Sequence, residues 1–258
     1  MAVAGYGRMS PETRPDIFEH LFVLGRPAGG KSEFIDFMKK LPADERARRF
    51  GIGRFEEIDD FPWLWERCLD DDAREDRGEA RLVSERTPEG YNITQPGFRS
   101  SLVVRFNEAI GAKYLANPAF YQDGTLLIEF ARGVGDGFRN SLERFDPAIL
   151  RRGAILYIQV SFEESFRRNS ARYKPGQEES TLFHKVPDRD MLGFFRDNDW
   201  HEITGGAPDG WLNVAGVRVP FVSMDNEPES TDPAVLGPRY ARALRRLLER
   251  RRAAVAGS

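Results

Sequence analysis

The chain has few of the residues that redox and metal sites need. Its single cysteine, Cys68, can form neither an intramolecular disulfide nor a cysteine-based metal cluster, so we expect a buried or incidental thiol. The three histidines, His20, His184 and His201, are widely scattered, which argues against a histidine-based metal site. No apolar run is long enough to span a bilayer, so no membrane partner is predicted.

An excess of one charge is missing as well. The 258 residues include 38 basic and 41 acidic side chains, which gives a net charge of −3. Bulk electrostatics therefore predict no nucleic-acid partner. The first twenty residues contain no continuous apolar stretch of the kind that a secretory signal needs, so the sequence predicts a cytoplasmic protein.

Residues 25–32, GRPAGGKS, match the phosphate-binding pattern G-x-x-x-x-G-K-[ST] at every fixed position. Glycines let backbone N–H groups curl around phosphate oxygens, the lysine reaches the outer phosphates, and the Ser32 hydroxyl can ligate Mg²⁺. We therefore predict ATP and Mg²⁺ as ligands. The residues expected to hold the nucleotide are Gly25, Arg26, Pro27, Ala28, Gly29, Gly30, Lys31, Ser32 and Glu33.

The surroundings of this loop fit the pattern. Residues 18–24 before it end in four consecutive apolar residues, which is typical of a short strand buried on both faces. After it, Phe34, Phe37, Met38 and Leu41 share one face of a helix that Pro42 terminates. The N-terminus of that helix would point its free N–H groups at the phosphates.

Strands alternate with helical patterns along the chain. Further strands are predicted at residues 54–59, 125–130 and 154–160, and a fifth at 217–224. We therefore expect an α/β fold, a three-layer sandwich with a mostly parallel five-stranded sheet. Pro220 cannot donate a ladder hydrogen bond, which predicts an edge or a bulge, with residues 211–214 as a hairpin partner. The arginine-rich C-terminal stretch predicts an amphipathic closing helix.

Two stretches interrupt the alternation. About 65 residues separate the second and third strands, which is too long for a plain connection. That stretch includes a helix with Leu102, Phe106, Ile110 and Tyr114 on one side. Residues 173–187 contain a Pro-Gly pair that breaks any helix, so we expect a mobile flap there.

Glu129 is the first candidate for the acidic groups of a phosphoryl-transfer site. It ends an apolar run, which is typical of a Walker B carboxylate at the carboxyl edge of a parallel strand. We predict that Glu129 and Ser32 hold Mg²⁺ and that Lys31 and Glu129 are catalytic. The alternative is a charge that caps an exposed strand end.

The acids that close the second strand are the next candidates. Neighbouring carboxylates raise one another's pKa, which suits a general base that takes a hydroxyl proton. We predict Asp59 as that base, although the pattern does not decide between Glu57, Asp59 and Asp60, and a solvated strand end is the alternative. The aromatic residues in 61–65 could stack on a nucleobase or belong to the core.

An arginine cluster follows the fourth strand. Ser161 and Glu164 form a capping box, which predicts a helix that begins there and leads into the flap. We predict Arg168 and Arg172 as catalytic arginines, and Arg167 and Arg168 as nucleotide contacts, because closure over a triphosphate needs guanidinium groups. Surface salt bridges with neighbouring glutamates are the alternative.

From about residue 18 to residue 250, this layout resembles the nucleoside and nucleotide kinase branch of the P-loop NTPases. Residues 56–65, EEIDDFPWLW, are similar to a deoxynucleoside kinase segment in which Glu-Pro-Val precedes Trp and the Glu is the base. IEFAR, residues 128–132, is similar to the Glu-Arg-Ser segment of that family. Here Glu-Pro-Val is absent, and two residues separate Glu129 from Arg132.

The resemblance implies a P-loop NTPase fold of nucleoside/nucleotide kinase type, with residues 1–258 as a single P-loop kinase-like domain. It implies a helical acceptor-binding insertion at 61–120 and an arginine-bearing lid at 162–190. In adenylate-kinase-like folds the segment after the last strand lies near the adenine, which implicates residues 223–229.

We therefore expect an ATP-dependent kinase that moves the γ-phosphate to a small-molecule acceptor, which is a nucleoside, a nucleotide or another metabolite. The acceptor would lie between the insertion and Glu129. Two alternatives stay open: a regulatory switch that hydrolyses NTP, and a nucleotide-binding module without transfer activity. The expected partners are ATP and the acceptor, and a homodimer is left open.

Overall fold

The computed structural model describes residues 16–172 and 185–255, so most of the predicted flap, residues 173–184, lies outside the described residues. The elements run in the order β1 His20–Gly25, α1 Lys31–Lys39, α2 Ala43–Phe50, β2 Arg54–Asp59, α3 Phe61–Glu75, β3 Ser84–Thr87, β4 Gly90–Ile93, α4 Phe98–Ser101, α5 Val103–Ile110, the π-helical turn η2 Gly111–Leu115, the 3-10 turn η3 Pro118–Gln122, β5 Gly124–Phe130, α6 Phe138–Leu142, α7 Pro147–Arg151, β6 Gly153–Gln159, α8 Phe162–Arg172, α9 Asp188–Gly193, α10 Trp200–Thr204, β7 Asp209–Val214, β8 Val217–Asp225 and α11 Pro233–Val255. None of the helices in these two ranges combines the length and the apolar character that a bilayer span requires.

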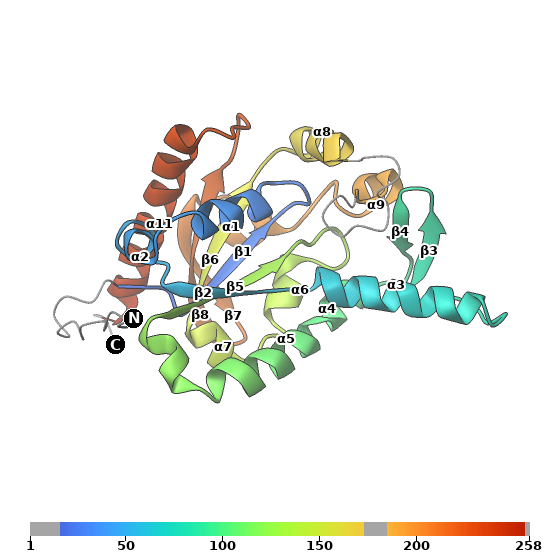
Figure 1. Cartoon of the computed structure of the whole chain (residues 1–258), viewed down its shortest axis with the longest axis horizontal. Helices are drawn as coiled ribbons and strands as arrows, with labels where there is room; N and C mark the ends of the chain where they lie inside the picture. The colour runs from blue at the N-terminus through green and yellow to red at the C-terminus, as the bar shows by residue number, and fades with distance from the viewer. Residues whose placement is uncertain (1–15, 173–184, 256–258) are drawn as a thin grey trace, which may run out of the picture.

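Within the described residues, the main sheet has six strands in the order β2-β5-β1-β6-β8-β7 (Figure 1). Every neighbouring pair is parallel except β7 and β8. The mostly parallel α/β sheet is confirmed, but the predicted count of five was wrong because β7 adds a sixth strand. The hairpin across Ala215 and Gly216 is confirmed, with Val214 opposite Val217.

The sequence predicted an edge strand or a bulge at Pro220, and the structure shows neither, because the register between β7 and β8 runs through this residue without a bulge. β8 lies inside the sheet between β6 and β7. Pro220 is paired with Trp211 of β7, and the pairing of β8 with β6 begins only at Phe221. The proline therefore lies just outside the stretch that pairs with β6, and this position accommodates a residue without a backbone N–H.

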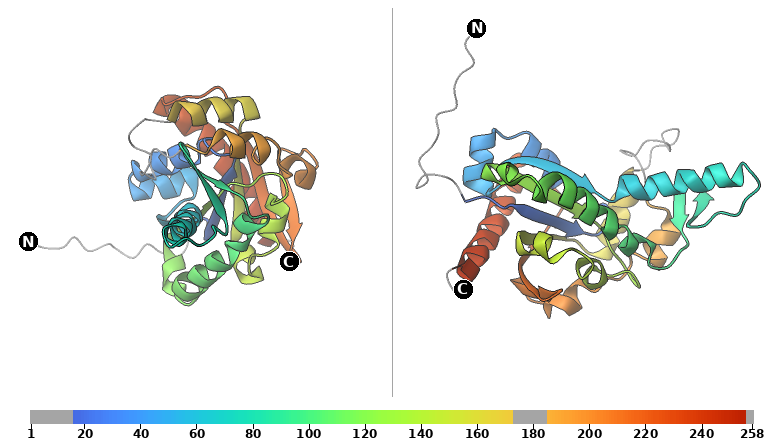
Figure 2. Two further views of the ribbon diagram at one scale, coloured as in Figure 1. Left: turned by 90° about the vertical axis from the view of Figure 1, so that its right-hand side faces the viewer. Right: turned by 90° about the horizontal axis from the view of Figure 1, so that it is seen from below.

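Helices cover both faces of the sheet, because its central strands are apolar on both sides. In β1, Leu21 and Val23 belong to the core shared with α1 and α11. Phe22 and Leu24 belong to the opposite core, which α5, α6 and α7 close. Side chains alternate between the faces of a strand, so a continuous apolar run predicts this double burial. Figure 2 shows the three layers in two further views.

The insertion after β2 contains α3, the β3–β4 hairpin, α4 and α5. In Figures 1 and 2, α3 and the hairpin extend away from the body of the sheet. We predicted a helical insertion, and the hairpin was missed because each of its strands has only four residues. Buried Asp71 of α3 attaches it, because its carboxylate accepts N–H groups from Leu82, Val83 and Ser84.

Phe106 tests how much the core beneath the insertion contributes to stability. Its side chain is fully buried, whereas Val104 on the same helix is 54% exposed. We expect Phe106→Ala to lower the free energy of unfolding by about 3–5 kcal/mol, because it removes a buried ring and leaves a cavity. Val104→Ala is the matched control and should change it by less than about 0.5 kcal/mol. Denaturant unfolding measures both, and equal losses would contradict this packing.

Candidate active site

The loop of residues 25–32 joins β1 in the middle of the sheet to α1. Gly30 has a φ of 107°, and a Cβ there would lie 2.2 Å from Nδ2 of Asn226. That amide donates a hydrogen bond to the carbonyl of Gly29 at 2.9 Å. A residue just after β8 therefore holds the loop in place, and a side chain at position 30 would displace this contact.

Lys31 opens α1 and is buried. Its Nζ donates to the carbonyl of Arg26 at 3.0 Å and lies 3.8 Å from Oε1 of Glu129. Glu129 is paired in register with Val23 of β1, whose side chain packs on the α1 face of the sheet. Register partners in neighbouring strands point to the same face, so Glu129 meets the lysine of the loop.

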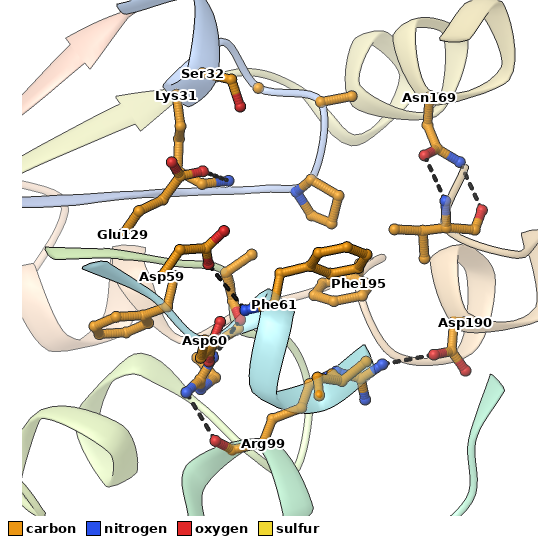
Figure 3. A pocket seen from close by; sticks show the side chains of 18 of the residues that line it. Lys31, Ser32, Asp59, Asp60, Phe61, Arg99, Glu129, Asn169, Asp190 and Phe195 are labelled. Carbon is orange, nitrogen blue, oxygen red and sulfur yellow. Dashed lines mark hydrogen bonds and ion pairs between the residues drawn. The ribbon is translucent and has the colours of Figure 1, made fainter. Parts of the chain in front are cut away.

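Asp59 stands beside Glu129, because the two are register partners on β2 and β5. Burial raises the pKa of Asp59 well above its usual value, and repulsion from Glu129 and Asp60 raises it further. Burial also raises the pKa of Glu129, against the opposing effect of Lys31. Two acids and one lysine thus share the carboxyl end of adjacent strands (Figure 3).

The structure distinguishes the acids that the sequence left open. Glu57 is exposed and pairs with Lys39 at 2.6 Å, outside the pocket. Asp60 lines the pocket and is paired with Arg132 at 2.7 Å. Asp59 also lines it and accepts the backbone N–H of Phe61 at 3.0 Å. Among the residues described, no lysine or arginine lies within ion-pair distance of Asp59.

The far wall of the pocket comes from the insertion and from the segment around α9. The side chains that line it there are Phe61, Leu64, Tyr91, Ile93, Arg99, Asp190 and Phe195. Arg99 is paired with Asp190 at 2.6 Å, and its guanidinium lies 4.2 Å from the ring centre of Phe194. Removal of one partner from such a buried pair typically costs about 3–5 kcal/mol.

Sequence reasoning noted Arg132 and residues 61–65 but missed most of this wall. Arg99 lies on a short helix 91 residues before Asp190, and Phe195 follows the short helix of Asp190, so no motif spacing connects the three. Asn169 lines the pocket too, and its amide exchanges hydrogen bonds with the backbone of Val186. Only the three-dimensional arrangement brings these residues together.

The structure brings Arg172 to the pocket but not Arg167 or Arg168. Arg172 pairs with Glu33 at 3.0 Å. Arg168 is buried and donates to Glu164 and to the carbonyl of Asn226, while Arg167 pairs with Glu164 and Glu229. These pairs fix the two arginines against the segment after β8, so their predicted nucleotide contacts and the predicted catalytic position of Arg168 find no support in the geometry.

The helix that carries these arginines starts where it was predicted, but the capping box is only half formed, because the N–H of Ser161 donates to Glu227 and not to Glu164. The N–H of Glu164 donates to the Ser161 hydroxyl at 3.2 Å, and α8 begins at Phe162. Asn226 places residues 223–229 beside the loop of residues 25–32, and no contact tests the predicted proximity to adenine.

The oxygen donors at the loop suit Mg²⁺ bound with a nucleotide. Ser32, Asp59 and Glu129 line one pocket, and hydroxyl and carboxylate oxygens are ligands that Mg²⁺ prefers. In the described ranges, no group of three or more His, Cys, Asp or Glu side chains could hold a metal by itself. Mg²⁺ is commonly held by one or two carboxylates together with substrate phosphates and water, and this donor set fits that mode.

Comparisons with known proteins are uninformative about function. No protein-family model and no curated protein matches the chain. The crystal structure of APE1195 is similar over 92% of this chain and 99% of that chain, with 12% identity and a TM-score of 0.41. A chain of the Pnkp1/Rnl/Hen1 RNA repair complex is similar over 71% of this chain and 45% of its own length, with 14% identity and a TM-score of 0.32. Both scores are too low to carry an argument.

The raised pKa of Asp59 predicts a pH-dependent cost in stability. The Asp59 carboxyl has a lower pKa in the unfolded chain than in the folded protein, so the unfolded chain loses this proton first as pH rises. The free energy of unfolding therefore falls between the two pKa values. Asp59→Asn should therefore raise the melting temperature at about pH 8 by about 2–4 °C, the shift that ~1 kcal/mol produces in a domain of this size.

The effect should disappear below about pH 4, where the carboxyl is protonated in both states. Glu57→Gln is the control, because the exposed pair of Glu57 with Lys39 lies outside the pocket. Thermal melts across pH measure both variants. If Asp59→Asn were less stable than the wild type at high pH, repulsion of Asp59 by Glu129 and Asp60 would not be a cost to the folded state.

Proposed function

We propose that this protein is a P-loop phosphotransferase of nucleoside/nucleotide kinase type, which moves the γ-phosphate of ATP to a small-molecule acceptor. The observation that carries the proposal is the convergence of Lys31, Asp59 and Glu129 in one pocket at the carboxyl edge of a parallel sheet. Open α/β sheets bind ligands at this edge.

The loop and α1 supply the phosphate site in this proposal. Backbone N–H groups of residues 25–32 face the phosphate oxygens, and the helix N-terminus adds its positive end. Lys31 exchanges its contact with the Arg26 carbonyl for the outer phosphates. Arg172 leaves its exposed pair with Glu33 to neutralise charge on the migrating phosphoryl group.

Ser32 and Glu129 would hold Mg²⁺, which neutralises phosphate charge when it is bound. Asp59 accepts the proton of the acceptor hydroxyl as the acceptor oxygen bonds to the γ-phosphorus. The bond from the γ-phosphorus to the β–γ bridging oxygen breaks, and ADP leaves with that electron pair. The raised pKa of Asp59 suits this role, because a base works best with a pKa near the operating pH.

The wall built by the insertion and by the segment around α9 favours transfer over hydrolysis. Phe61, Tyr91 and Phe195 line the side of the pocket away from the loop, where a second substrate would exclude water. A switch that hydrolyses ATP and a module that only binds it remain the competing outcomes of the experiment.

The experiment is a panel of hydroxyl and phosphate acceptors, nucleosides first, with consumption of Mg·ATP and labelled product as readouts. We expect Lys31→Ala to lower kcat by about 100-fold or more, since it removes charge stabilisation from the transferring phosphate. Glu129→Gln should lower kcat much more than it weakens ATP binding.

Lys39→Ala is the matched control, because Lys39 ends the same helix outside the pocket. Its kcat should equal that of the wild type. An active Lys31→Ala variant would overturn the proposal, and so would ATP consumption that releases only inorganic phosphate with every acceptor. Binding of Mg·ATP without turnover would indicate the binding module.

A further inference from the structure

Every described cation that lines the pocket is already paired with a carboxylate. Lys31 faces Glu129, Arg99 is paired with Asp190, Arg132 with Asp60, and Arg172 with Glu33. The pairs differ in how easily a ligand could replace the carboxylate, and this difference divides the pocket into two halves.

On the side of the loop, the pairs are loose or exposed. Lys31 and Glu129 are 3.8 Å apart, and the side chains of Arg172 and Glu33 are 35% and 49% exposed. Water already solvates much of the second pair, so a phosphate group can displace its carboxylate at little cost. Both cations can therefore turn to a triphosphate.

On the side of the insertion, the pairs are close and buried. Arg132 is 1% exposed, and it also donates to Ser141 Oγ and to the carbonyls of Arg99 and Ala131. The side chains of Arg99 and Asp190 are each 9% exposed, and the Asp190 carboxylate also accepts the N–H of Ile93. If a phosphate took the place of the Asp60 or Asp190 carboxylate, that carboxylate would stay buried without its arginine partner, which is unfavourable.

The remaining lining of this half is apolar or aromatic. Phe61 and Leu64 come from α3, Tyr91 and Ile93 from β4, and Phe195 follows α9. In Figure 3, Phe61 and Phe195 lie between the acids of the strand ends and the Arg99–Asp190 pair. Such a surface favours a ligand with a ring or another apolar group. A guanidinium that is paired with a carboxylate can still donate hydrogen bonds to oxygens of the ligand.

From these contacts we infer that the acceptor is an uncharged alcohol with an apolar or aromatic body, and that the Arg99–Asp190 and Arg132–Asp60 pairs exclude phosphate monoesters. The inference rests on the proposed function and names the substrate class of that site. Asp190 is then a specificity-determining residue, because it keeps Arg99 from acting as a phosphate receptor.

The test is a calorimetric titration of the protein saturated with Mg²⁺ and a non-hydrolysable ATP analogue, with phenyl phosphate and inorganic phosphate as probes. We expect no saturable binding to the wild type up to about 10 mM of either probe. Asp190→Asn frees Arg99 and should bind phenyl phosphate saturably with a Kd of about 1 mM or lower, about tenfold below the concentration at which the wild type shows no binding, through a charge-assisted hydrogen bond.

Asp188→Asn is the matched control, because Asp188 lies on the same helix as Asp190 but does not line the pocket. Its carboxylate pairs with Lys185. It should behave as the wild type. The inference would be overturned if the wild type bound phosphate saturably and Arg99→Met abolished that binding. This outcome does not depend on a variant at Asp190. An Asp190→Asn variant that folds, by its melting curve, yet binds no more tightly would also overturn it.

A turnover assay separates this inference from the proposed function. Matched nucleosides and their 5′-monophosphates are compared as acceptors, and we expect any active pair to favour the nucleoside. Faster transfer to the monophosphate would overturn the inference and leave the phosphotransferase intact. If no acceptor is phosphorylated, the proposed function fails, while the phosphate titration still decides whether the pocket excludes phosphate.

Discussion

The crowding of carboxylates at the ends of β2 and β5 is the constraint on which the rest of the site depends. Asp59, Asp60 and Glu129 meet there at low exposure, and burial and mutual repulsion raise the pKa of both Asp59 and Glu129. Lys31 offsets only part of this charge. The arrangement costs stability, and in the proposed function a bound Mg²⁺ would offset part of the negative charge; such a loss of stability is common at functional sites.

Much of the frame was predictable because it follows from local patterns. The loop of residues 25–32 and the position of Glu129 follow from apolar runs that end in a glycine or an acid. The capping contact of Ser161 was predictable in the same way. Each of these patterns is local in the sequence, because it spans about a dozen residues or fewer and does not depend on tertiary packing.

The far wall of the pocket was not predictable for the opposite reason. Arg99 and Asp190 are 91 residues apart, and neither belongs to a motif. The β3–β4 hairpin carries Tyr91 to the pocket on β4, a strand of four residues, and Asp71 of α3 holds the start of the hairpin at Val83 and Ser84. The arginines of α8 show the converse, because their density predicted nucleotide contacts, whereas the structure brings Arg172 to the pocket and holds Arg168 on Glu164 and on the backbone after β8. Arginine density alone does not distinguish these outcomes.

The most direct test of the central claim is a crystal structure of the protein with Mg²⁺ and a non-hydrolysable ATP analogue. The account predicts that the triphosphate lies inside residues 25–32 with Lys31 on its outer phosphates. It also predicts that Mg²⁺ is bound to the Ser32 hydroxyl and lies within reach of Glu129. A triphosphate bound elsewhere, or a metal remote from Asp59 and Glu129, would contradict it.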